Sequence, residues 1–186
     1  MGTTALFGFR YPALTDSPAV PTHIQNLAQD VEDRLNYTRY VRLAADVTKT
    51  SSTAMGDVTG LSFSLAASAE YGIDGYIPYY CLDGVDCRLA WTGPTGMTVS
   101  FSFLGSETTT TSPTGMGNWT SLEAVGDANY ILLNTETDTS IHTIPRGYFK
   151  TGVTSGTLQL RFAQNVSNAS PLTIRRGSWL RIYRLA

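Results

Sequence analysis

Residues 61–65 read Leu-Ser-Phe-Ser-Leu, so that apolar and small polar side chains alternate at every step. Because successive side chains of a β-strand point to opposite faces, this stretch offers one face to a core and the other to solvent. Residues 99–103 and 158–162 repeat the pattern, and residues 179–185 end the series. Turns rich in Gly, Pro, Asp and Ser separate these segments. We therefore expect an all-β fold, an antiparallel β-sandwich of the jelly-roll type over residues 37–186.

The composition of the 186-residue chain fits a domain with a real core and a weakly charged surface. Hydrophobic residues make up 42% of the sequence, but charged residues only 15%, so Thr, Ser, Asn and Gln must supply the surface polarity. The formal net charge of −2 argues against nucleic acid as a partner, because nucleic-acid binders carry a basic surface. No apolar run approaches the roughly 18 residues of a membrane span, so we expect no membrane insertion.

Residues 22–36 carry the pattern of one short amphipathic helix. Thr22 can act as its N-cap, and Gln25 completes a capping box three residues later. A helix of about 14 residues is marginal alone in water, so its apolar stripe must contact its own domain or copies of itself. The predicted contact face consists of Ile24, Leu27, Val31 and Leu35.

Residues 1–21 read as an extended arm, because three prolines exclude a helix there. The arm is too apolar for a solvated tail, so we expect it to dock on its own domain, on a neighbouring copy or on a larger assembly. The residues predicted to anchor it are Phe7, Phe9, Tyr11, Pro12, Leu14, Pro18, Val20 and Pro21.

No arrangement of residues in the sequence points to catalysis. A Gly-x-Ser-x-Gly elbow is absent, and the candidate carboxylates lie in turn-like contexts that favour solvated side chains. His23 falls on the predicted helix and His142 in a predicted strand, where a surface or structural imidazole is the favoured interpretation. We therefore expect no catalytic residue, no cofactor and no metal site, and we do not expect an enzyme.

The two cysteines, Cys81 and Cys87, flank the turn signal Asp83-Gly84. We expect them at the two ends of a hairpin loop. We favour the interpretation that they are two free thiols in a reducing cytoplasm. A disulfide between them remains an alternative, and it requires that their Cα atoms lie within about 7 Å of one another.

Residues 11–21, followed by the helical pattern at 24–32, resemble the N-terminus of minor structural proteins of tailed phages of actinobacteria. The similarity continues in order along nearly the whole chain. It covers a strand at 58–65, an aromatic strand at 71–80, a Thr-Gly-Pro turn at 92–94 and closing segments at 156–163 and 176–180. The pair Cys81 and Cys87 departs from the pattern, whose loop there is usually Ser- and Thr-rich, so the resemblance implies no role for the cysteines.

The resemblance implies a virion protein, made in the host cytoplasm and exposed on the particle: a minor tail protein, a fibre tip or a head decoration. It also implies a jelly roll of the tumour-necrosis-factor and C1q type that assembles as a homotrimer, with an arm that docks to other virion proteins of the capsid or tail. The alternative function is a receptor-binding adhesin that recognises a host surface glycan through distal loops. Trp119, in a polar loop region, is the best candidate for stacking on a sugar.

The C-terminal segment 179–185 is expected to form the contact between copies. Its side chains alternate, yet neither face is cleanly polar, and an isolated sandwich buries only one face of each sheet. Aromatic residues and Arg are enriched at protein interfaces. In the jelly rolls that the chain resembles, the final strand lies against the threefold axis. The residues predicted for the interface are Trp179, Arg181, Tyr183 and Leu185.

Overall fold

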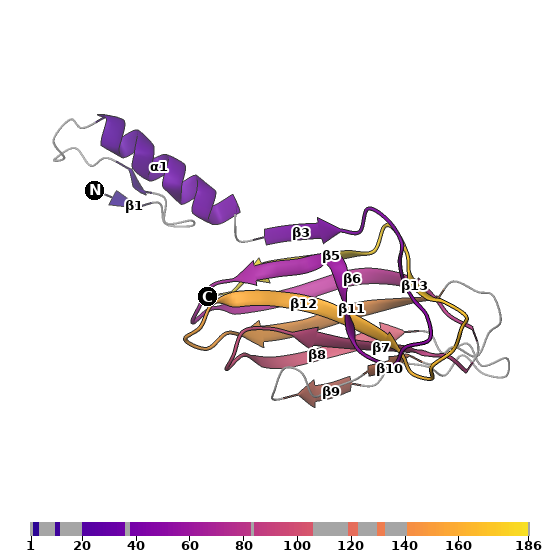
Figure 1. Cartoon of the computed structure of the whole chain (residues 1–186). Coiled ribbons are helices and arrows are strands. Elements are labelled where there is room, and N and C mark those ends of the chain that lie inside the picture. Colours follow the sequence, from indigo (N-terminus) through magenta and orange to yellow (C-terminus); the bar gives the residue numbers. More distant parts are fainter. Residues whose placement is uncertain are drawn as a thin grey trace. The chain divides into compact units, whose positions relative to one another are not determined.

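The computed structural model describes residues 2–3, 10–11, 20–35, 38–82, 84–105, 119–122, 130–132 and 141–185. The chain divides into two compact units, Met1–Arg39 and Tyr40–Ala186. The first unit holds the helix and two short strands, and the second holds the β-sandwich (Figure 1).

The N-terminal unit contains β1 (Gly2–Thr3), β2 (Arg10–Tyr11) and α1 (Val20–Leu35). β1 and β2 pair antiparallel, with Gly2 opposite Tyr11 and Thr3 opposite Arg10. Antiparallel pairing requires the chain to reverse direction between the two strands. The arm therefore returns on itself before α1 begins.

The helix begins at Val20, two residues before the expected start at residue 22, and ends at Leu35. Pro21 thus lies in the first turn rather than in the arm. Proline is tolerated there because the first backbone N–H groups of a helix have no intrahelical acceptor in any case.

The strands of the sandwich form two antiparallel sheets. The smaller sheet has the order β10-β7-β12-β5, and the larger sheet has the order β3-β14-β6-β11-β8-β9, with β13 pairing β4 and β6 at its side. The expected antiparallel sandwich with one short helix is confirmed. The strands are β3 (Thr38–Arg42), β4 (Val47–Lys49), β5 (Gly56–Leu65), β6 (Glu70–Tyr80), β7 (Cys87–Thr92), β8 (Thr98–Gly105), β9 (Trp119–Leu122), β10 (Tyr130–Leu132), β11 (Ile141–Lys150), β12 (Gly156–Gln164), β13 (Leu172–Ile174) and β14 (Trp179–Arg184).

The core lies between the two sheets and has an aromatic centre. Trp91 of the smaller sheet packs against Phe101, Phe103 and Phe149 of the larger sheet, with ring centroids 6.3, 6.0 and 5.5 Å away. Each of these side chains is buried. Burying one such side chain contributes roughly 1.5–3 kcal/mol, so this cluster is a main source of cohesion between the sheets.

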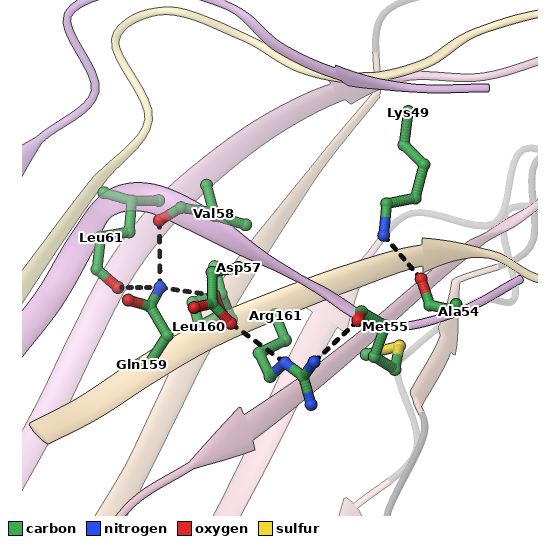
Figure 2. Close-up of polar contacts among 9 residues, drawn as sticks. All are labelled: Lys49, Ala54, Met55, Asp57, Val58, Leu61, Gln159, Leu160 and Arg161. Atoms are coloured by element: carbon green, nitrogen blue, oxygen red, sulfur yellow. Dashed lines mark hydrogen bonds and ion pairs between the residues drawn. The ribbon is translucent and has the colours of Figure 1, made fainter. Parts of the chain in front are cut away.

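An irregularity between β5 and β12 shapes the outer face of the smaller sheet. The register shifts between Gln159 and Arg161, and Gly60 takes a φ of 98°, a conformation that favours glycine. The Gln159 side chain donates from Nε2 to the carbonyl oxygens of Val58, Leu61 and Leu160 at 3.0, 3.3 and 2.7 Å (Figure 2). The side-chain amide of Gln159 therefore supplies hydrogen bonds to backbone carbonyl groups at the irregularity between β5 and β12.

The turn between Cys81 and Cys87 crosses from one sheet to the other, because β6 belongs to the larger sheet and β7 to the smaller one. The expected hairpin is wrong here: β6 pairs with β11 and β14 instead of β7. Both cysteines are buried and are free thiols. Burial raises the pKa of the Cys87 thiol well above its ordinary value, which makes the thiolate form scarce.

Candidate contact surfaces

The apolar stripe of α1 is exposed. Ile24, Leu27 and Val31 have exposed fractions of 63%, 46% and 39%. Leu35 ends the helix, and its side chain lies outside the described residues. Each apolar side chain left in water forgoes roughly 1.5–3 kcal/mol of burial, so a row of three on one face is a candidate contact surface.

A different side of α1 is occupied by the arm of the same chain. The backbone N–H of Arg10 donates to Asp30 Oδ2 at 2.5 Å, and Arg10 Nε donates to Asp30 Oδ1 at 2.9 Å. The guanidinium also donates to Asn26 Oδ1 and to the Asn26 carbonyl oxygen, at 3.2 and 3.1 Å. The Asp30 side chain is 14% exposed and the Arg10 side chain 37% exposed, so the carboxylate is the better shielded partner of this ion pair. The arm is thus fastened to the polar flank of α1 through Arg10, a residue that the sequence did not single out.

The predicted anchoring residues fall into two groups. Tyr11 lies in β2, and Val20 and Pro21 lie in α1. Their docking to another protein stays a prediction. The remaining predicted residues lie outside the described residues: Phe7, Phe9, Pro12, Leu14 and Pro18.

The two faces of β14 separate as the alternation predicts. Leu180 and Ile182 are buried in the core, whereas Arg181 and Tyr183 lie on the outer face of the larger sheet. Trp179 is half-buried on the outer face, and Leu185 follows the end of the strand and is exposed. Their role as an interface between copies stays a prediction.

Two contacts with β6 hold side chains on the outer face of β14 in place. Arg181 binds Asp74 of β6 through two hydrogen bonds, Nε to Oδ1 at 3.0 Å and Nη2 to Oδ2 at 2.5 Å. Tyr183 lies across Gly72 of β6, since a Cβ added at Gly72 would sit 2.3 Å from the tyrosine ring. Both long side chains are therefore held down along the sheet.

An aromatic row extends this face beyond β14. The rings of Tyr40 in β3 and Trp179 lie 5.8 Å apart, and Trp179 is opposite Tyr76 of β6 in the strand register. The rings of Tyr76 and His142 of β11 lie 5.1 Å apart. Tyr40, Tyr76 and His142 are exposed, and the sequence did not single them out for this face. The signal was available for Tyr76, because it alternates with the buried Ile77 in β6.

The other candidate residues do not gather into a site. Trp119 begins β9, where it pairs with Ser102 of β8, and its side chain lies outside the described residues. Within the described part of the chain, no group of three His, Cys, Asp or Glu side chains could hold a metal ion. No helix in that part has the length and apolar character needed to cross a bilayer.

No family model and no curated protein matches the chain. Among solved structures, the tripod from the baseplate of bacteriophage Tuc2009 aligns over 95% of this chain and 98% of that chain, at 8% identity and a TM-score of 0.36. The infectious bursal disease virus VP2 subviral particle aligns over 80% of this chain and 41% of that chain, at 11% identity and a TM-score of 0.20. At TM-scores this low, neither likeness carries an argument about function.

Proposed function

We propose that this protein is a structural component of a phage particle: a homotrimeric minor tail, fibre or head-decoration protein that docks to the virion through its N-terminal unit. The observation that carries the proposal is the exposed stripe of Ile24, Leu27 and Val31 on α1. An exposed apolar face on a helix of the N-terminal unit is the kind of surface that marks a contact with another protein. The resemblance of the sequence segments, in their order, to phage structural proteins supports the proposal that the particle is a phage.

The outer face of β14 supports association between copies. Its residue types, Trp179, Arg181, Tyr183 and the neighbouring Tyr40 and Tyr76, are those enriched at the energetic centres of protein interfaces. Because Arg181 and Tyr183 already lie along the sheet, little side-chain freedom would be lost when a second copy covers them. We propose this face as the homotrimer contact and assign no catalytic role to the protein.

The mass of the purified protein in solution tests the trimer. One chain has a mass of 20.2 kDa, so light scattering should give about three times that value. Replacing Tyr183 by Asp should give monomers, because it puts a charge into the proposed contact. Thr157→Asp, at an exposed position of β12 on the other sheet, is the matched control and should stay trimeric.

A mass near 20.2 kDa for the unmodified protein would eliminate the trimer. The competing arrangement, in which the arm covers the β14 face of its own chain, gives that monomer mass. Docking by the arm is tested separately. A protein that starts at Pro21 should fold but fail to enter particles, and normal incorporation would refute the anchoring role of the arm but not that of the α1 stripe, which this protein keeps.

A further inference from the structure

The outer face of β11 carries an arginine whose charge is not paired. Arg146 is exposed, and its guanidinium makes no ion pair or hydrogen bond with the described residues. In the larger sheet, β11 lies between β6 and β8 (Figure 1). The register places Arg146 opposite Asp74 of β6 and opposite Ser102 of β8. Asp74 is therefore the nearest carboxylate in the register.

Both carboxylates on the outer face of β6 already bind another cation. Asp74 accepts from Arg181 Nε at 3.0 Å through Oδ1 and from Arg181 Nη2 through Oδ2. Glu70 Oε1 lies 3.0 Å from Lys150 Nζ, and Glu70 also accepts a hydrogen bond from the Tyr148 hydroxyl group. The five N–H donors of the Arg146 guanidinium are thus left for solvent or for an anionic group of another molecule.

On its β8 side, Arg146 borders a part of the face with small polar side chains. Tyr148 follows Arg146 by two residues in β11, so both side chains lie on the same face, and Tyr148 is half-buried. The residues opposite them in β8 are Ser102 and Ser100, of which Ser100 is exposed. A guanidinium, a phenol ring and an exposed hydroxyl group therefore come together on two neighbouring strands.

The backbone pairing continues this row to the residue that the sequence indicates as the best candidate for stacking on a sugar. Trp119 of β9 is opposite Ser102, which is itself opposite Arg146. Neighbouring strands lie about 4.8 Å apart, so the backbone positions of Arg146 and Trp119 are about 10 Å apart. A cation and the position of a large aromatic residue thus share one row across three strands.

We propose that Arg146, Tyr148 and Ser100 bind a uronic acid unit of an acidic polysaccharide. The planar guanidinium of Arg146 matches a carboxylate through two parallel hydrogen bonds. The Tyr148 ring offers an apolar face to the C–H groups of the sugar ring, and the Ser100 hydroxyl group can donate to and accept from sugar hydroxyl groups. The site lies on β11 and β8, and it does not depend on the trimer contact proposed for β14.

Titration calorimetry with polygalacturonate at low salt tests the site on the full chain. Arg146→Gln should weaken binding by about tenfold, because it removes a charge-assisted contact. Arg146→Lys should bind with an affinity between the two, because an ammonium group keeps the charge but cannot form the bidentate pair. Lys150→Gln is the matched control: it removes a cation from the same face of β11 and should bind the polymer as the unmodified protein does.

The role of the Tyr148 ring is tested by a pair of variants. Tyr148→Phe keeps the ring and removes the hydroxyl group that binds Glu70, so it should retain the affinity for polygalacturonate. Tyr148→Ala removes the ring and should weaken binding several-fold. Equal affinities for these two variants would rule out stacking on Tyr148.

Two further polymers test the chemistry of the ligand. Methyl-esterified polygalacturonate keeps the sugar rings without the charge and should bind more weakly than polygalacturonate. Polyglutamate keeps the carboxylates without the sugar rings and should also bind more weakly, and equal or tighter binding would overturn the sugar in favour of an acidic peptide. No detectable binding of polygalacturonate, or equal losses for Arg146→Gln and Lys150→Gln, would overturn the site.

Discussion

The inner faces of the sandwich and the stripe of α1 both show a periodic apolar pattern, but the first is buried and the second is exposed. Phe149 of β11 and Leu160 of β12 follow a two-residue period and are completely buried. Ile24, Leu27 and Val31 follow a helical period and are exposed. The difference lies in what covers each face: the two sheets cover one another, whereas the arm contacts α1 at Asn26 and Asp30, beside the stripe.

Periodicity therefore identifies which residues share a face but not what lies against that face. In the sandwich, the opposing face comes from the same chain, so burial contributes to the folding of a single molecule. For α1, we propose that burial of the stripe contributes to association with another protein instead. The two regions should respond differently to substitution.

The largest effect is expected in the aromatic core. Phe149→Ala removes a ring that contacts Trp91 and Phe101 and leaves a cavity between the sheets. We expect the free energy of unfolding to fall by about 3–5 kcal/mol, measured by chemical denaturation. Val153→Ala, at a side chain that is 91% exposed and outside the proposed contact face, is the control and should cost much less. Similar losses for the two variants would contradict the division into buried and exposed apolar side chains.

Much of the sandwich could be predicted from the sequence because its strands alternate cleanly. The segments 61–65, 99–103 and 158–162 lie in β5, β8 and β12, with their apolar residues buried. The assignment of strands to sheets could not be predicted the same way. A turn such as that between Cys81 and Cys87 has the same sequence features in both cases, whether it joins two paired strands or connects one sheet to the other.

The contact surfaces were predictable only in part, for a similar reason. Trp179 and Tyr183 could be placed on the outer face by alternation within one strand. Their neighbours Tyr40 and His142 come from strands distant in sequence, and only the pairing of β3, β14, β6 and β11 brings them into one row. The Arg10–Asp30 ion pair likewise joins residues 20 positions apart, one in β2 and the other in α1.

A smaller effect on folding is expected on the stripe of α1. Leu27→Asp should change the free energy of unfolding of the sandwich by no more than about 0.5 kcal/mol, because Leu27 is exposed and lies in the other unit. The same change should disrupt assembly, measured as mass by light scattering and as incorporation into particles. Gln25→Asp, also exposed on α1, is the control. If Leu27→Asp leaves both mass and incorporation unchanged, the stripe is not a contact face.

The smallest effect is expected at an ion pair on the surface of the sandwich. Glu70 Oε1 lies 3.0 Å from Lys150 Nζ, and hydrogen bonds from Lys150 and then Tyr148 lower the pKa of Glu70 below its ordinary value of 4.5. A lowered pKa in the folded state means that the ionised carboxylate stabilises the fold above pH 4.5, and that this contribution is lost as the pH falls further. Glu70→Gln should therefore flatten the decline of stability below pH 4.5, measured by denaturation at a series of acidic pH values. Because the pair is exposed, the difference between the two proteins should shrink in high salt. If the stability of the unmodified protein and that of Glu70→Gln fall identically with pH in low salt, the Glu70–Lys150 contact contributes nothing to the fold. The stabilising contacts of β6 and β11 would then lie on the buried face of the sheet.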